Sequence, residues 1–480
     1  MVIFFVSLLL LAGGPLDYQA ADKPLNGTAL RGFRPVETHE VVLEKLGDEE
    51  LLVFTGWNNR QTAIYARTRS PESDDWIEPV RISSPEARFD SLPSVWAGSD
   101  QAAHCVWQSK TRQDHYKVLY SRRGPVSREW TAPVWIGEAG GLRRNPVSIT
   151  GDSSGNLFIW THNSPPGEMH PELQVFRSQD GGRTWERSRP FASLQAGVVS
   201  LFDPRLVVTG RGELHFLALR TQQVTTVLLT SSEDAGRSWT APVALNETLS
   251  PRISDPRLWA SDSLVQATWV DQPERSRGIR RLEAAFLTLS GEKRKIQRQL
   301  VQEISHNRSL SYSVWDDGRQ VGLTWMERRK KGPSAVRQRV TIQDERIHLG
   351  ETATIVESRP GFHFEELAAS HRPDLVLMTE KKVVTPPVLQ ACSKGGNESW
   401  ECEKIHTTTG SSDILAPLLV AEESANQYRV IFHEVRFKVH IMQTVLDTTI
   451  LTGTVTLKGG DGGTSNGEGN QGNASSSEFK

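Results

Sequence analysis

Two aspartates, Asp180 and Asp234, recur in this chain with a spacing that suits chemistry. Each is the third residue of the pattern S-x-D-x-G-x-S/T-W, at residues 178–185 and 232–239. A repeated carboxylate is a candidate metal ligand or proton donor. The flanking residues favour a turn instead, because aspartate accepts hydrogen bonds from turn amides, glycine takes a positive φ angle and tryptophan covers a neighbouring sheet. We interpret both motifs as β-hairpin turns and expect neither aspartate to be catalytic.

The tryptophan that ends the motif recurs along the chain with a period of about 54 residues. The recurring residues are Trp76, Trp130, Trp185, Trp239 and Trp400. Prolines at positions 93, 146, 204 and 256 and tryptophans at 107, 160, 269 and 325 keep a similar spacing. Repeats of this length that read as short strands and turns, with no helical periodicity, are typical of propeller blades.

The elements that must position any site are therefore the strands of an all-β propeller with four-stranded blades. First-strand candidates begin near residues 36, 93, 146, 204, 256, 311, 364 and 416, which predicts eight blades, with seven as the alternative. We expect the propeller to span residues 22–457 and the Gly/Ser/Asn-rich residues 458–480 to form a disordered tail.

The first 21 residues predict export. Their apolar run has the length of a signal-peptide core and is too short to span a membrane, and no later segment is long and apolar enough to span one. Glycosylation triplets N-x-S/T without proline support a secreted, extracellular glycoprotein. The acceptors are Asn26, Asn246, Asn307, Asn397 and Asn473.

The charge and the three cysteines narrow the chemistry further. With 55 basic and 57 acidic side chains the net charge is −2, which argues against a nucleic-acid partner. Cys392 and Cys402 flank an expected hairpin and predict a disulfide, whereas Cys105 lies in an apolar strand and predicts a buried thiol. The sequence predicts no cofactor and no metal site.

The motifs and their period resemble the sialidase (neuraminidase) superfamily, whose members carry the same Asp-box repeat, over roughly residues 30–350. The resemblance implies three arginines that clamp a sugar carboxylate, a tyrosine nucleophile, a carboxylate that activates it and an aspartate acid/base. A phenol is suited to attack on a negatively charged sugar, and bidentate arginines suit its carboxylate. By this resemblance Tyr312 is the candidate nucleophile and Asp203 its activator. The substrate-binding arginines would be Arg34, Arg220 and Arg280, with Arg281 as the alternative to Arg280.

The chain also departs from the family pattern. The segment Phe33-Arg34-Pro35 lacks a residue between the arginine and the proline, and residues 56–62 contain no aspartate where the acid/base is expected. Asparagine at 58 and 59 cannot transfer a proton. The repeats also continue beyond the six that a sialidase needs.

Three functions therefore remain open from the sequence. The first is a secreted sialidase-like propeller that recognises glycans and hydrolyses terminal sialic acid. The second is a non-catalytic extracellular propeller that binds protein or glycan partners. The third is another Asp-box glycoside hydrolase with paired carboxylates. In each case the expected ligand is a glycan or a glycoconjugate, and the expected state is a monomer, because a closed ring leaves few free strand edges.

Overall fold

The computed structural model describes residues 41–58, 61–70, 76–110, 116–139, 147–163, 172–194, 200–246, 250–273, 279–289, 295–305, 312–316, 321–329, 332–343, 346–357, 362–369, 375–382, 385–394, 400–407, 412–421, 427–440 and 443–456. Every regular element in these residues is a β-strand, so the predicted all-β class is confirmed. Within them, no helix is long and apolar enough to cross a membrane. The signal segment at residues 1–21 and the tail at 458–480 lie outside the described residues.

The described residues group into two compact units. The N-terminal unit contains those between 41 and 305, and residues 342–343 and 346–347 group with it. The C-terminal unit contains those from 312 to 341 and from 348 to 456.

The N-terminal unit contains five four-stranded antiparallel sheets, numbered here in chain order. Sheet 1 consists of β1 (Val41–Leu46), β2 (Glu49–Asn58), β3 (Gln61–Arg69) and β4 (Val80–Arg81). Sheet 2 consists of β5 (Asp90–Ala97), β6 (Ala103–Lys110), β7 (Tyr116–Arg123) and β8 (Val134–Ala139). Sheet 3 consists of β9 (Ser148–Gly151), β10 (Leu157–Asn163), β11 (Glu172–Ser178) and β12 (Glu186–Ser188). Sheet 4 consists of β13 (Ser200–Val208), β14 (Leu214–Thr221), β15 (Thr225–Ser232) and β16 (Val243–Ala244). Sheet 5 consists of β17 (Arg252–Ala260), β18 (Leu264–Gln272), β19 (Ile279–Thr288) and β20 (Lys295–Ser305).

The remaining three sheets belong mainly to the C-terminal unit. Sheet 6 consists of β21 (Tyr312–Asp316), β22 (Val321–Arg329), β23 (Gly332–Gln343) and β24 (Arg346–Glu357). Sheet 7 consists of β25 (Phe362–Ala369), β26 (Leu375–Lys382), β27 (Thr385–Lys394) and β28 (Trp400–Thr407). Sheet 8 has three strands, β29 (Ser412–Ala421), β30 (Gln427–His440) and β31 (Gln443–Thr456).

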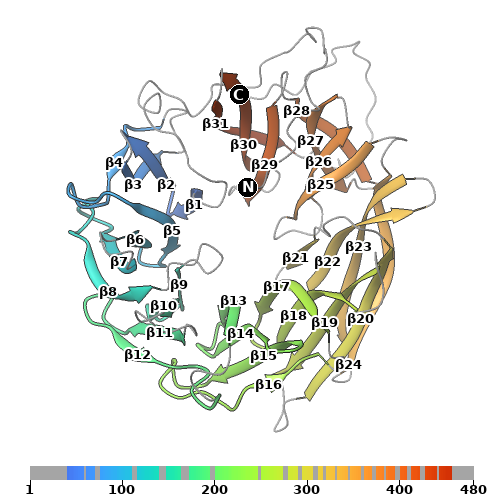
Figure 1. Ribbon diagram of the computed structural model, residues 1–480, viewed down its shortest axis with the longest axis horizontal. Coiled ribbons are helices and arrows are strands. Elements are labelled where there is room, and N and C mark those ends of the chain that lie inside the picture. Colours follow the sequence, from blue (N-terminus) through green and yellow to red (C-terminus); the bar gives the residue numbers. More distant parts are fainter. Residues whose placement is uncertain are drawn as a thin grey trace, which may run out of the picture. The chain divides into compact units, whose positions relative to one another are not determined.

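Each sheet follows the chain order, as the blades of β-propellers do. In the N-terminal unit the first strands of successive sheets contact one another, β1 with β5, β5 with β9, β9 with β13 and β13 with β17. These strands lie on the inner side of the unit in Figure 1, whereas the fourth strands β4, β8, β12 and β16 lie on its outer side.

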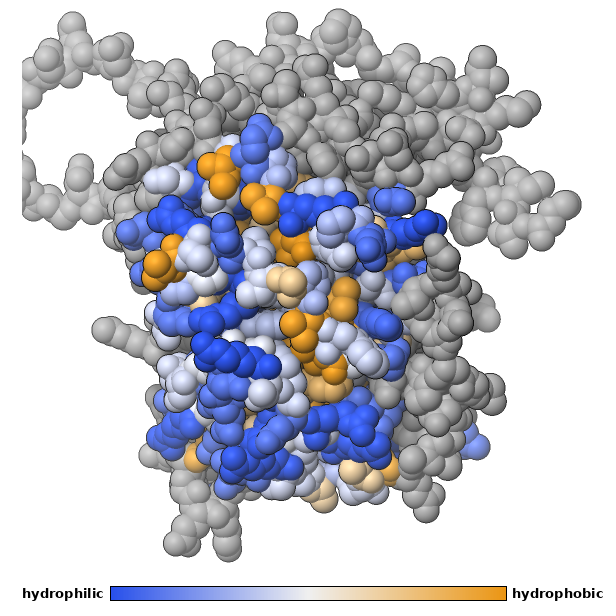
Figure 2. Space-filling model, turned by 90° about the vertical axis from the view of Figure 1, so that its left-hand side faces the viewer, coloured by the Kyte–Doolittle hydropathy of each residue, from blue (hydrophilic) through white to orange (hydrophobic). Residues whose placement is uncertain are grey.

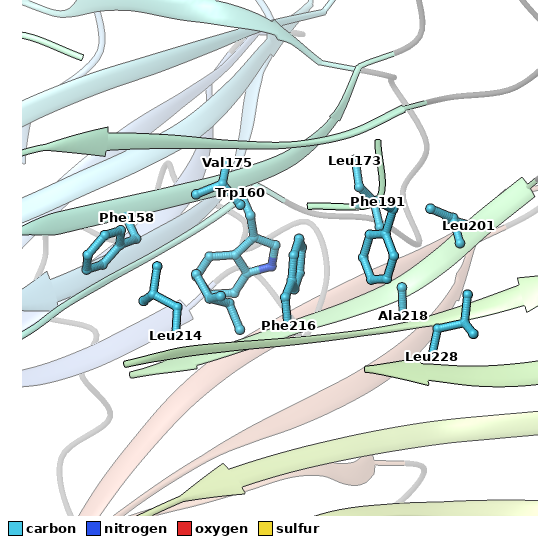
Figure 3. Packing of buried hydrophobic residues seen from close by; sticks show 11 residues of the cluster. Phe158, Trp160, Leu173, Val175, Phe191, Leu201, Leu214, Phe216, Ala218 and Leu228 are labelled. Atoms are coloured by element: carbon cyan, nitrogen blue, oxygen red, sulfur yellow. The ribbon is translucent and has the colours of Figure 1, made fainter. Parts of the chain in front are cut away.

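Apolar side chains fill the spaces between neighbouring sheets of the N-terminal unit. One cluster joins sheets 3 and 4 and includes Trp160, Phe191 and Phe216, whose rings are seen together in Figure 3. A second cluster around Trp269 joins sheets 4 and 5. Burying side chains of this size contributes roughly 1.5–3 kcal/mol each, so packing between sheets is a principal stabilising term.

Four of the regularly spaced tryptophans occupy the second strands of their sheets. Trp107, Trp160, Trp269 and Trp325 lie in β6, β10, β18 and β22, and their exposed fractions are 0%, 8%, 1% and 0%. Trp107 donates a hydrogen bond from Nε1 to Oδ2 of Asp90 at 2.8 Å. The period seen in the sequence thus reports a position in the sheet that faces the core.

A bulge interrupts the first strand of several sheets. The register shifts between Ser91 and Ser94, between Phe202 and Arg205, and between Ser254 and Arg257. The first bulged residue has a positive φ angle in each case, 57° at Leu92, 48° at Asp203 and 53° at Asp255.

Each of these bulges ends in a proline, at positions 93, 204 and 256. These prolines lie within the strand rather than at its start, because a bulge tolerates a residue that cannot donate to the ladder. Pro146 lies outside the described residues.

Candidate functional site

The sheets of the N-terminal unit have two chemically different ends. In a chain-ordered antiparallel sheet the turns after the first and third strands lie at one end, and the turn after the second strand lies at the other. Residues 178–185 and 232–239 join third to fourth strands in sheets 3 and 4, and they define the motif end. The opposite end carries the last residues of β14 and β18 and the first residues of β15, β17 and β19.

At the motif end, Asp180 organises the turn of its motif. Its Oδ1 accepts hydrogen bonds from the backbone N–H groups of Arg183 at 3.0 Å and Thr184 at 2.9 Å. Its Oδ2 accepts one from the Thr184 hydroxyl at 2.6 Å, and the Ser178 hydroxyl donates to Oδ1 at 2.7 Å. These bonds, led by that of the Thr184 hydroxyl, hold the pKa of Asp180 well below its usual range.

The turn around Asp234 repeats this geometry. The backbone N–H of Ser238 donates to Oδ1 at 2.9 Å and its hydroxyl donates to Oδ2 at 2.6 Å. Desolvation acts to raise the pKa of Asp234, but the hydrogen bonds from Ser238, Ser232 and Arg237 outweigh it and lower the pKa to about 2. A carboxylate that stays ionised and is saturated with donors from its own turn is a poor proton shuttle, as the structural interpretation of both motifs requires.

The motif turn of sheet 3 also contacts sheet 2. Tyr120 on β7 donates a long hydrogen bond, 3.5 Å, to the carbonyl of Gly181, and its ring meets that of Trp185 edge-on at 5.1 Å. The Tyr120 hydroxyl is also 2.8 Å from Nδ1 of His104 on β6. Burial lowers the pKa of His104 to about 4, so this ring is neutral at physiological pH.

At the opposite end, sheet 5 presents two arginines on one face. Arg252 pairs with Gln272, and Arg280 lies on the same face of β19 because Arg281, its neighbour, pairs with Asp271. Burial and the nearby Arg252 guanidinium both lower the pKa of Arg280. Among the described residues neither Arg252 nor Arg280 forms an ion pair, so this face offers two guanidinium groups and an amide to a ligand.

On the other face of sheet 5 the arginine charge is balanced by nearby carboxyl groups. Asp271 has an exposed fraction of 2%, and burial raises its pKa, opposed by a hydrogen bond from Ser250 and by the charge of Arg281. Arg281 in turn donates from Nε to Oε2 of Glu303 at 3.1 Å. Because Asp271 follows Trp269 at a spacing of two residues, it lies on the face that packs against sheet 4.

Backbone and hydroxyl contacts fix the start of β17 against sheet 4. The N–H of Thr225 donates to the carbonyl of Ser250 at 2.7 Å, and the Thr225 hydroxyl donates to the carbonyl of Pro251 at 3.4 Å. The Ser250 hydroxyl donates to the carbonyl of Gln272 at 3.1 Å. The backbone that carries Arg252 is therefore held by contacts with both sheet 4 and sheet 5.

Arg220 lies at the same end but on another face. It follows Phe216 and Ala218 at two-residue spacing, and both belong to the cluster between sheets 3 and 4. Its Nη2 donates to the hydroxyl of Thr226 at 3.4 Å, and it pairs across the ladder with Leu201. The structure therefore brings Arg280 together with Arg252, whereas Arg220 lies on the side of sheet 4 that faces sheet 3.

The other residues implied by the resemblance are placed as follows. Asp203 occupies the bulge of β13, in the middle of the strand rather than at its start. Tyr312 begins β21 in the C-terminal unit and is 2% exposed. Arg34 lies outside the described residues.

The disulfide between Cys392 and Cys402 is present, joining paired residues of β27 and β28. Cys105 is a free and buried thiol, as expected. In the described part of the chain no group of three metal-ligating side chains is placed to hold an ion.

One of the glycosylation acceptors is described in full. Asn246 donates from Nδ2 to the carbonyl of Thr225 at 3.1 Å, and its Oδ1 accepts from the N–H of Val227 at 2.8 Å. Asn26, Asn307, Asn397 and Asn473 lie outside the described residues.

Sequence reasoning missed Arg252 and Asp271. The repeat itself could have revealed Asp271, because Asp271 occupies the same ladder position in sheet 5 as Arg220 does in sheet 4. In each second strand this position lies two residues after the residue that faces the bulge of the first strand. Arg252 carried no motif, and only its position across from Gln272 reveals that it shares a face with Arg280.

Comparisons with known proteins identify a fold likeness and no family. No family model matches the chain, and no curated protein matches it. Among solved structures, the polysaccharide lyase Uly1 is 10% identical with a TM-score of 0.45, and the match covers 81% of this chain and 96% of that one. An ulvan lyase bound to a glucuronate-rhamnose-sulfate chain is 11% identical with a TM-score of 0.43, with 76% and 92% covered. An intramolecular trans-sialidase from Ruminococcus gnavus is 10% identical with a TM-score of 0.37, with 75% and 92% covered.

Proposed function

We propose that this protein is a secreted propeller that recognises acidic glycans through arginines at the end of its sheets opposite the motif turns. The observation that carries the proposal is the pair Arg252 and Arg280 on one face of sheet 5, close enough for Arg252 to lower the pKa of Arg280. Two guanidinium groups without a carboxylate partner among the described residues are poised for an anion. A sugar carboxylate accepts bidentate hydrogen bonds from such groups. The likeness to glycan-active enzymes carries no weight at these TM-scores.

Export is part of the proposal. The disulfide between Cys392 and Cys402 supports an oxidising compartment, because such bonds are rare where thiols are kept reduced. The leader and the glycosylation triplets of the sequence point the same way.

The binding proposal is tested by titrating the purified protein with sialyllactose in a calorimeter. The Arg280→Ala variant should weaken binding by about 10- to 100-fold, the equivalent of one lost charged hydrogen bond. Arg281→Ala is the matched control, because Arg281 is already paired with Glu303 and lies on the other face. Equal effects of the two substitutions, or no binding by the wild type, would reject the proposal.

The finer version of the proposal is hydrolysis of terminal sialic acid. In it the oxygen of Tyr312 bonds to the anomeric carbon while the glycosidic bond breaks, a base takes the phenolic proton, and water then releases the sugar. The resemblance assigns the base to Asp203 and the carboxylate clamp to Arg34, Arg220 and Arg280. The departing oxygen needs a proton, and the sequence offers no aspartate for this. An aryl sialoside has an acidic leaving group and needs little such help, whereas sialyllactose needs it fully.

A fluorogenic aryl sialoside assayed across pH 4 to 7, beside sialyllactose, tests this version. Turnover of the aryl substrate alone, lost in Tyr312→Phe, is the expected result for a tyrosine nucleophile without an acid. Turnover that persists in Tyr312→Phe would remove Tyr312 from the mechanism.

The second candidate is a non-catalytic binding propeller, and two observations favour it. Tyr312 is only 2% exposed, and the backbone position of Asp203 recurs at Leu92 and Asp255, so a structural role explains it. Absence of turnover with either substrate, with sialyllactose binding retained, would establish this candidate.

A further inference from the structure

A cavity of about 500 Å³ lies between sheets 3 and 4, beside β12, and reaches the Asp234 motif turn. One wall is the end of β12 and the turn that follows it, including Arg187, Ser188 and Arg189. The other wall is the Asp234 motif turn, with Arg237 and Trp239. A space of this volume takes a ligand of one or two sugar rings.

The walls of the cavity are rigidly supported. Trp239 donates from Nε1 to the hydroxyl of Ser188 at 3.1 Å, which ties one wall to the other. Its ring lies 6.1 Å from that of Phe216, and Phe216 lies 5.7 Å from Phe191 in the cluster of Figure 3. The cavity is therefore formed before a ligand arrives, which lowers the entropic cost of binding.

The cavity is positively charged. Arg189 forms an ion pair with Glu172 at 3.2 Å, whereas Arg237 donates to the neutral amide of Gln179 at 3.3 Å. Within the described ranges Arg237 pairs with no carboxylate. The side chain of Arg187 lies on the other face of β12, because Arg187 pairs with Phe176, which packs against sheet 2. One guanidinium group without a carboxylate partner in the described residues, that of Arg237, thus lines a space that also offers an indole ring and hydroxyl groups.

We infer that this cavity is a second glycan-binding site, which takes a carboxylated or sulfated sugar of one or two rings. Arginine binds carboxylate and sulfate oxygens in a bidentate manner, and the indole offers an amphipathic surface to the sugar ring. Elsewhere on the outside of the unit, β4 and β8 carry isolated exposed apolar side chains, Val80, Val134 and Trp135. The face in Figure 2 likewise has small apolar groups among hydrophilic ones.

The second site is independent of the proposed function. Arg252 begins β17 and Arg280 lies at the start of β19, at the end opposite the motif turns, whereas Arg237 lies beyond the last residue of β15, at the motif end. The eight residues of β15 span about 25 Å, at roughly 3.3 Å per residue. One sugar unit cannot bridge the two ends, so each site can be removed without the other.

The test uses the whole protein and two probes, an unsulfated chondroitin disaccharide with one uronate and its 4-sulfated counterpart, titrated in a calorimeter. Binding of at least one probe is expected, and Arg237→Ala should weaken it by about tenfold or more. The matched control is Arg183→Ala, because Arg183 occupies the position of Arg237 in the other motif but does not line the cavity. Binding of both probes identifies the carboxylate as the common determinant, and binding of the sulfated probe alone identifies the sulfate.

Three results would overturn the inference. One is the absence of binding by the folded wild type. Another is an equal loss in Arg183→Ala, which would mean that surface charge alone attracts the probes. The third is a loss in Arg280→Ala with none in Arg237→Ala, which would assign the binding to the opposite end of the sheets.

Discussion

Gly182 is expected to be irreplaceable because of a neighbour in another sheet. Its φ angle is 87°, and a Cβ atom placed on it would lie 1.9 Å from the Tyr120 hydroxyl oxygen and 2.4 Å from Tyr120 Cζ. Gly155, in the turn after β9, has nearly the same φ angle, 83°, but a Cβ atom there would meet nothing within 4 Å. Both glycines therefore adopt a positive φ angle, but only Gly182 lies against a side chain of a neighbouring sheet.

The difference sets the expected magnitudes. Alanine in the left-handed region costs about 1–2 kcal/mol, and this should be the whole effect of Gly155→Ala. Gly182→Ala adds about 1–3 kcal/mol for the steric conflict and about 1 kcal/mol for the lost bond between Tyr120 and His104. We expect a total loss of about 4 kcal/mol for Gly182→Ala.

Urea unfolding followed by tryptophan fluorescence measures both variants. In the background of Tyr120→Ala the extra cost of Gly182→Ala should disappear, since the conflicting ring is gone, which leaves only the backbone cost. Equal losses for Gly182→Ala and Gly155→Ala in the wild-type background would refute the proposed contact between the motif turn and sheet 2.

Four further predictions follow from individual groups. Replacing Cys392 and Cys402 by serine should lower the free energy of unfolding by about 3 kcal/mol, because the disulfide closes a loop with a sequence separation of 10. Denaturant titrations of the reduced wild-type protein should show the same loss of stability. The pKa of Asp234 is lowered to about 2 in the folded state, so the unfolded state binds more protons between pH 4 and 2. Stability should therefore fall as the pH is lowered from 4 to 2, and melting curves of Asp234→Asn should show a smaller fall. Burial raises the pKa of Glu44 to about 7, so stability should fall as pH rises from about 4.5 to 7 by up to about 3 kcal/mol, and Glu44→Gln should abolish this fall in melting curves. Asp203→Asn should unfold at the same urea concentration as the wild type, because asparagine tolerates a positive φ angle equally well, and a loss of sialoside turnover in this variant would then report chemistry and not backbone strain.

The features that the sequence predicted correctly are local ones. The turn of Asp180 is closed by bonds to residues no more than four positions away, so the motif contains all of its own partners. The disulfide joins cysteines on adjacent strands of one hairpin. The tryptophan period reports burial at one position of four second strands, as packing between stacked sheets requires.

The opposite end of the sheets could not be predicted in the same way. Arg252 and Arg280 are 28 positions apart, and they share a face only because β18 pairs with both of their strands in a particular register. Neither residue type nor spacing encodes this, since a shift of one residue would move either side chain to the other face.

The bulge shows why residue counting fails at Asp203. The inserted residue changes the alternation of side chains along β13, so residues before and after it cannot be assigned to faces by one count. Leu92 holds the same conformation as Asp203 and Asp255, which shows that the backbone there does not require a carboxylate. Aspartate eases a positive φ angle more than leucine does, so sheets 4 and 5 carry the residue that lowers strain and sheet 2 does not. Each aspartate thus favours the positive φ angle of its bulge, whether or not its carboxylate also takes part in chemistry. Only a substitution that keeps this backbone preference, such as asparagine, can reveal a chemical role of the carboxylate.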